Sequence, residues 1–261
     1  MKKIFLLIAT LSFLASCDNI DEKDRYIPVE NRPLERKVLL EEFTGQNCVN
    51  CPEAHQVIEK LQEQFGDNLI VVSIHAGQFG IPAEDDGLME PQGNIYNDRW
   101  NITAWPCGVI DRNSGVLNSD MWSTVIRKDG LYPADMTLDL TATLSDDNKK
   151  IDITTELTSD ANIKGALQLW VVENDIVGYQ RDGNKRIPDY VHNNVFRGCV
   201  NGTWGEDIEI QNNESLHFYN SVDVQENMPY EINDWNVNNL YIVGFVYNES
   251  GVIVVNKCKV E

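Results

Sequence analysis

The tetrad Cys-Val-Asn-Cys at residues 48–51 lies between an apolar run, residues 38–40, and a segment of helical periodicity, residues 54–65. A CxxC pair at a strand-to-helix junction places its first thiol against the unsatisfied N–H groups of the helix. These groups favour the thiolate, which is the form that attacks disulfides. The second thiol lies one helical turn away and can resolve a mixed disulfide. The tetrad therefore indicates a redox module, a small disulfide staple or half of a metal site.

The first residues have the layout of a secretory signal. Two lysines precede an apolar stretch over residues 4–13, which is too short to span a bilayer. It ends in Leu-Ala-Ser-Cys at residues 14–17, which resembles the bacterial lipobox, so we expect residues 1–17 to be a lipoprotein signal peptide and Cys17 to be lipidated. The alternative is an ordinary cleaved signal with an incidental cysteine. Residues 18–37 begin with acidic residues and are predicted to form a solvated tether.

Composition limits the classes of partner. The formal charge of −20 leaves no basic surplus for phosphate backbones, so we expect no nucleic acid partner. Six cysteines in an exported chain indicate an oxidising compartment. Once Cys17 is set aside, the simplest pairing joins Cys48 to Cys51 and Cys199 to Cys258. This pairing leaves Cys107 without a disulfide partner.

The rest of the chain shows two different patterns of secondary-structure signals. Residues 38–132 alternate strand and helix signals, and a helix over 54–65 between apolar strands predicts a βαβ unit with a parallel strand pair. Residues 77–93 are rich in Gly, Pro and acids and indicate a long loop or insertion. Residues 133–261 carry about seven short alternating strands, which predict an antiparallel sandwich of immunoglobulin type. We therefore expect an α/β domain over 38–132 and an all-β domain over 133–261.

The residues that enter the tetrad, Leu-Glu-Glu-Phe-Thr-Gly, resemble the strand and loop of thioredoxins. That resemblance implies a buried acid six residues before the first cysteine, where Glu42 stands, that carries protons for the second cysteine. It also implies a cis proline facing the tetrad, and Pro106 stands in the expected place before the strand at 109–110. The alternatives are a surface glutamate in an ion pair and a loop proline in the trans form.

His55 raises a metal alternative. It lies four residues after Cys51 on the same helical face and could join Cys48, Cys51 and Cys107 in a soft copper or zinc site. A partly buried helix histidine and a small buried cysteine are the simpler interpretations of His55 and Cys107. Without a second CxxC or a histidine cluster, we predict no metal and no other cofactor.

Three features together resemble one family. The lipobox, the run Leu-Glu-Glu-Phe-Thr-Gly-x-x-Cys-x-x-Cys-Pro and the segment Tyr-Val-His-Asn-Asn-Val-Phe-Arg at residues 190–197 resemble the Omp28-related outer-membrane lipoprotein family of Bacteroidetes. The resemblance covers the mature chain. It implies a thioredoxin-like domain followed by an immunoglobulin-like β-sandwich. It also implies a location at the outer membrane, on its periplasmic face or at the cell surface.

Two functions follow as hypotheses. In the first, the protein is a thiol–disulfide oxidoreductase anchored to the membrane through Cys17, which acts on envelope or surface proteins. Cys48 attacks, Cys51 resolves, Glu42 relays the proton and Pro106 shapes the substrate groove. Asn47 and the pair Val49-Asn50 depart from working thioredoxins, so neither oxidation nor reduction is assigned.

In the alternative, the protein is a non-enzymatic surface binding or adhesion lipoprotein, and the fold is a scaffold with a buried disulfide.

Overall fold

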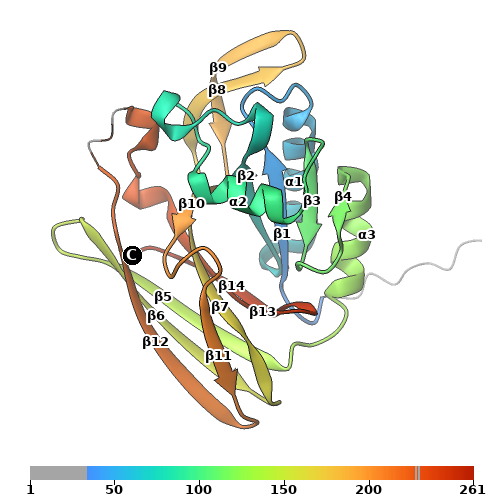
Figure 1. The fold of residues 1–261 in the computed structure, drawn as a ribbon, viewed down its shortest axis with the longest axis vertical. Helices are drawn as coiled ribbons and strands as arrows, with labels where there is room; N and C mark the ends of the chain where they lie inside the picture. The colour runs from blue at the N-terminus through green and yellow to red at the C-terminus, as the bar shows by residue number, and fades with distance from the viewer. Residues whose placement is uncertain (1–33, 227, 229) are drawn as a thin grey trace, which may run out of the picture. The chain divides into compact units, whose positions relative to one another are not determined.

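The computed structural model describes residues 34–226, 228 and 230–261 (Figure 1). The predicted signal peptide, Cys17 and most of the predicted tether lie outside these residues, so the lipid anchor stays a prediction. Leu34–Glu261 is one compact unit. No helix within the described part of the chain is long and apolar enough to cross a membrane.

The first part of the unit is built around the predicted βαβ motif. Strand β1 (Val38–Thr44) and strand β2 (Leu69–His75) pair in parallel, and helix α1 (Cys51–Phe65) connects them, as predicted. Helix α1 ends at Gly66, whose φ of 56° is a left-handed conformation that glycine adopts without steric cost. The elements that follow are α2 (Pro91–Arg99), β3 (Cys107–Ile110), β4 (Val116–Leu117) and α3 (Ser119–Asp129). Strand β3 pairs antiparallel with the other side of β1.

Strand β1 sends alternate side chains to two different cores, because successive residues of a strand point to opposite faces. Val38 and Leu40 pack with the apolar face of α1 and with α3. Leu39 and Phe43 pack on the opposite face, in a core that includes Tyr96 of α2. The same alternation directs Glu41 and Glu42 to opposite faces, with Glu42 on the face that α1 covers.

Residues 133–261 form antiparallel sheets, with ten strands in the described part where we predicted about seven. Strands β12, β6 and β5 make a separate three-stranded sheet, and β8 and β9 make a hairpin. The three-stranded sheet shares a hydrophobic core with β7, β11, β13 and β14. The bounds are β5 (Met136–Leu144), β6 (Lys150–Ser159), β7 (Ile163–Glu173), β8 (Ile176–Asp182), β9 (Lys185–His192), β10 (Val195–Cys199), β11 (Glu206–Ile210), β12 (Glu214–Asp223), β13 (Leu240–Asn248) and β14 (Gly251–Lys259).

The largest sheet crosses the boundary that we predicted at residue 132. Its strand order is β14-β13-β7-β10-β2-β1-β3-β4, with β11 also paired to β7. Strand β10 lies beside β2 and joins the two parts of the sheet through one parallel pair, Val195 with Ser73. Trp170 of β7 and Phe245 of β13 belong to the same core as Leu39. The two predicted domains therefore share a sheet (Figure 1). They also share a hydrophobic core.

Candidate functional site

Cys48 and Cys51 form a disulfide with a Cα–Cα distance of 5.4 Å, which confirms the predicted pairing. Cys48 lies in the turn after β1, and Cys51 is the first residue of α1. Pro52 is in the first turn of the helix, where its missing N–H would have no intrahelical partner. Both cysteines are buried, with exposed fractions of 2% and 0%.

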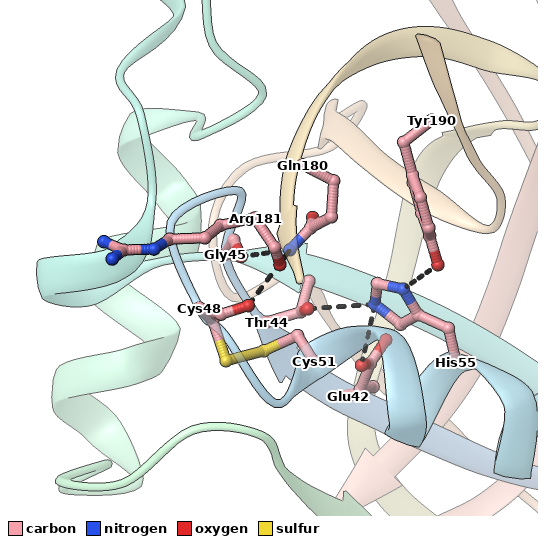
Figure 2. The surroundings of a disulfide bond; sticks show 9 residues. All are labelled: Glu42, Thr44, Gly45, Cys48, Cys51, His55, Gln180, Arg181 and Tyr190. Carbon is pink, nitrogen blue, oxygen red and sulfur yellow. Dashed lines mark hydrogen bonds and ion pairs between the residues drawn. A yellow bond between two sulfur atoms is a disulfide. The ribbon is translucent and has the colours of Figure 1, made fainter. Parts of the chain in front are cut away.

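The β8–β9 hairpin covers the tetrad (Figure 2). The Arg181 backbone N–H donates to the Gln46 carbonyl oxygen at 2.8 Å, and the Gly183 N–H donates to the Val49 oxygen at 3.1 Å. These carbonyls flank Cys48 on both sides. The tip of the hairpin is therefore bonded to the backbone of the cysteine loop itself.

A buried glutamine strengthens this contact. The Gln180 amide nitrogen donates to the backbone oxygens of Gly45, at 3.3 Å, and of Cys48, at 3.1 Å. In return, the Gln46 amide nitrogen donates to the Tyr179 carbonyl at 3.2 Å. The hairpin and the cysteine loop are thus joined by side-chain bonds in both directions. Figure 2 shows the bonds that Gln180 donates.

The segment predicted as an insertion, residues 77–93, packs against the same loop. The Asn47 N–H donates to the Phe79 carbonyl at 2.9 Å, and the Leu88 N–H donates to the Gln46 side-chain oxygen at 2.9 Å. Gly45 approaches this segment so closely that a β-carbon there would lie 2.5 Å from the Phe79 backbone carbonyl. A glycine is therefore required at this position.

Glu42 is buried in the middle of β1, under the helix that begins at Cys51. The Ser73 hydroxyl of the neighbouring strand donates to Glu42 Oε2 at 2.5 Å. The other carboxylate oxygen lies 3.3 Å from Nε2 of His55. Glu42 is therefore a buried acid, as the resemblance implies, and not a surface glutamate.

His55 links this acid to the hairpin. Its Nε2 lies 3.0 Å from Thr44 Oγ1, and its Nδ1 lies 2.8 Å from the Tyr190 hydroxyl of β9. Burial alone would lower the pKa of His55, but the carboxylates of Glu42 and, to a lesser extent, Glu59 outweigh this effect and the pKa is raised. A chain of proton-exchanging groups therefore runs from Tyr190 through His55 to Glu42 (Figure 2).

The Trp105–Pro106 peptide bond is cis, as expected for Pro106. Cys107 follows it in β3, opposite Phe43 of β1. Burial, with a further contribution from the Glu42 carboxylate, raises the pKa of the Cys107 thiol to about 12. Cys107 is therefore a small, protonated core residue.

The structure does not gather the predicted metal alternative into a ligand set. The sulfurs of Cys48 and Cys51 are bonded to each other, and both nitrogens of His55 face protein oxygens. Nowhere in the described ranges do three or more His, Cys, Asp or Glu side chains form a group that could hold a metal ion.

The predicted pairing of Cys199 with Cys258 is wrong, because both thiols are free within the described part of the chain. Cys199 ends β10 and Cys258 lies on β14, with β7 and β13 between these strands. Three strand spacings amount to about 14 Å, roughly twice the Cα separation that a disulfide allows. Cys199 instead lies 3.0 Å from the Tyr96 hydroxyl.

Sequence reasoning missed the residues that cover the disulfide. Gln180 lies in an ordinary alternating strand and carries no local signal. Tyr190 stands in the segment that supported the family resemblance, but nothing local connects it with His55. Both residues reach the site only because the hairpin folds back over α1.

Solved structures that resemble this chain include two that match it over most of its length. HBP35 of Porphyromonas gingivalis matches with a TM-score of 0.66 and 17% identity, over 87% of this chain and 76% of its own. Protein AGR_C_4864 of Agrobacterium tumefaciens matches with a TM-score of 0.51 and 12% identity, over 85% of this chain and 93% of its own. At these identities the likeness concerns the fold alone. No curated protein matches the sequence.

The family model described as outer membrane protein Omp28 matches residues 93–261, which is more than half of the chain. The match begins after the cysteine tetrad, so it does not bear on the disulfide. Its description confirms the predicted location at the outer membrane. The chain belongs to the outer membrane protein Omp28 family.

Proposed function

We propose that this protein is an outer-membrane lipoprotein that exchanges thiols and disulfides with envelope or surface proteins. The observation that supports this most strongly is the chain of Tyr190, His55 and Glu42 beside a helix that begins at the disulfide, with Glu42 buried and the other two partly buried. A disulfide staple alone does not need such a chain. Cys17 would hold the protein to the membrane.

The fold supports the same proposal. A parallel β1–β2 pair joined by α1, an antiparallel β3 and a cis Pro106 before β3 are the parts of a thioredoxin-like domain. We interpret the sheets of residues 133–261 as the immunoglobulin-like sandwich of the predicted architecture. Pro106 would shape the substrate groove of the first part, and the second part would present or recognise the partner.

The proposed reaction conserves atoms and electrons. In the reduced protein, the Cys48 thiolate attacks a substrate disulfide, forms a mixed disulfide and releases one substrate thiolate. Cys51 gives its proton to Glu42 and attacks the Cys48 sulfur, which restores the Cys48–Cys51 bond and releases the second substrate thiolate. The substrate gains two electrons and the protein loses two. The reverse sequence oxidises a substrate dithiol.

Access to the disulfide requires movement of the hairpin, because Cys48 is only 2% exposed. The polar contacts of Gln180, Arg181 and Gly183 hold the hairpin on the cysteine loop. His55 and Tyr190 would deliver or accept the Glu42 proton while the hairpin is closed. The hairpin therefore acts as a lid in this proposal.

Trapping tests the proposed function. The Cys51→Ser variant, expressed in its native envelope, should accumulate mixed disulfides through Cys48 that a reducing agent releases. The double variant Cys48→Ser/Cys51→Ser is the matched control, because it keeps Cys107, Cys199 and Cys258. Equal trapping by the two variants, or none by either, would count against exchange.

The complete burial of the disulfide favours a second candidate, a non-enzymatic surface binding protein with the cysteines as a staple. In that case the disulfide should have a very low reduction potential and should not reduce insulin. A redox titration, combined with measurement of the Cys48 pKa in the reduced protein, separates the candidates. A pKa at or above the value of a free cysteine favours the staple.

A further inference from the structure

A cavity of about 180 Å³ is lined mainly by residues of α1, β2 and β9. Three of the chain's four histidines line it, one from each of these elements: His55, His75 and His192. His55 is already engaged with Thr44 and Tyr190. The other two histidines have no role in the site described above.

His75 and His192 face each other in this cavity with unused nitrogens. Their rings are 5.4 Å apart between centroids and meet edge to face. Each residue is only 2% exposed, and none of their four ring nitrogens has a hydrogen-bond partner. The Tyr179 carbonyl lies near His192, but not at hydrogen-bonding geometry.

Buried polar groups in native proteins are normally hydrogen-bonded, so four idle nitrogens at one cavity require an explanation. Burial lowers the pKa of both histidines, and the neighbouring His55 lowers them further. Both imidazoles are therefore neutral at physiological pH and each keeps a free lone pair. A neutral imidazole is the form that binds zinc, copper and nickel ions.

We propose that this cavity binds one divalent first-row transition-metal ion through a ring nitrogen of His75 and one of His192. Two imidazoles do not complete a coordination shell, and no group of three ligands is assembled in the described residues. The cavity has room for the water molecules that would fill the remaining positions. One acidic and one basic side chain, Glu59 and Lys257, also line it. The cysteines take no part in this site.

Zinc titration of the full-length protein, with the disulfide oxidised and other metals removed, tests the proposal. Isothermal calorimetry should show one bound Zn²⁺ for the wild type. The His75→Ala and His192→Ala variants should each bind more than about 100-fold more weakly, because even changes to outer-shell residues weaken metal binding 10–100-fold. His217→Ala is the matched control and should bind like the wild type, since His217 is exposed on β12.

A spectroscopic measurement on the unaltered protein guards against misfolded variants. Electron paramagnetic resonance of the wild type with one equivalent of Cu²⁺ should show hyperfine coupling to two imidazole nitrogens. The proposal is overturned if the wild type binds no Zn²⁺ or if the Cu²⁺ spectrum shows no nitrogen ligands. It is also overturned if the two single variants both bind Zn²⁺ as tightly as the wild type. Thiol ligation by Cys199 or Cys258 would produce the last of these outcomes. Failure here would leave the proposed exchange function untouched.

Discussion

Arg112 offers the sharpest test of how the two parts of the unit are held together. Its Nε lies 2.6 Å from Glu41 Oε1, with side-chain exposures of 5% and 0%. The guanidinium also lies 4.3–5.7 Å from the ring centroids of four aromatic residues, which belong to α2, β7 and β13: Tyr96, Trp170, Phe245 and Tyr247. One cation thus connects residues from both sides of the predicted boundary at residue 132.

The Arg112→Ala substitution should lower the free energy of unfolding by about 5 kcal/mol. Breaking a buried ion pair costs about 3–5 kcal/mol, because the remaining charge, here Glu41, is left buried without a partner. Loss of the desolvated cation–π contacts adds about 1 kcal/mol or more. Alanine retains a β-carbon, so the cost of the positive φ of 56° at this position changes little.

Urea denaturation followed by tryptophan fluorescence and far-UV circular dichroism measures this loss. The Lys164→Ala variant is the control, because Lys164 pairs with Glu209 at 3.0 Å but both side chains are exposed. It should lose less than about 1 kcal/mol. In the double variant Glu41→Leu/Arg112→Met, no charge is left unpaired, and most of the lost stability should return.

Two results would refute this reasoning. Arg112→Ala could cost no more than Lys164→Ala, which would mean that the buried cation contributes little net stability. Alternatively, the two optical probes could report separate transitions. Separate transitions would show that residues 38–132 and 133–261 unfold independently in spite of the sheet and core that they share.

Three further outcomes are expected. Dithiothreitol should reduce the disulfide of the Gln180→Ala variant several-fold faster than that of the wild type. Gln168 is equally buried but lies on β7, so Gln168→Ala should not change the rate. Equal rates for the two variants would contradict the role of the hairpin as a lid. Burial raises the pKa of Asp111 to about 6, although the Arg36 guanidinium opposes this shift. The Asp111 carboxyl therefore binds a proton more tightly in the folded state than in the unfolded state. This contribution is present at low pH and is lost as the pH rises from about 4 to 6, so wild type should gain up to about 3 kcal/mol over Asp111→Asn as the pH falls through this window. Gly45→Ala should lower the midpoint temperature of thermal unfolding, because the added β-carbon would lie 2.5 Å from the Phe79 backbone carbonyl. An unchanged midpoint would show that residues 77–93 can move to accommodate the β-carbon at little cost.

Local patterns predicted the first part of the fold well. The helical spacing from Ala54 to Phe65, with Gly66 after it, predicts the end of α1 to the residue, and the helix starts three residues earlier than the spacing, at Cys51. The largely apolar run of β2 indicates burial on both faces, and every residue of β2 is buried. The disulfide between Cys48 and Cys51 follows from a sequence separation of three.

Long-range relations were beyond the sequence. The pairing of Cys199 with Cys258 followed from counting, and it is wrong because strand order places two strands between them. The continuation of the first sheet into residues 133–261 depends on β10 lying beside β2, through the single pair of Val195 with Ser73. Nothing in the sequence of β10 or β2 indicates that these two strands pair.

The sequence by itself therefore determined the local elements and the cysteine tetrad, because periodicity and spacing act over one or two turns of chain. The burial of Glu42 was implied only by the resemblance to thioredoxins. Only the tertiary structure decided what surrounds them. The hairpin over the disulfide, the link from Tyr190 to His55 and the facing rings of His75 and His192 all join segments more than 100 residues apart. Such contacts arise when sheets and helices bury their apolar faces together, and a single sequence does not state which faces meet.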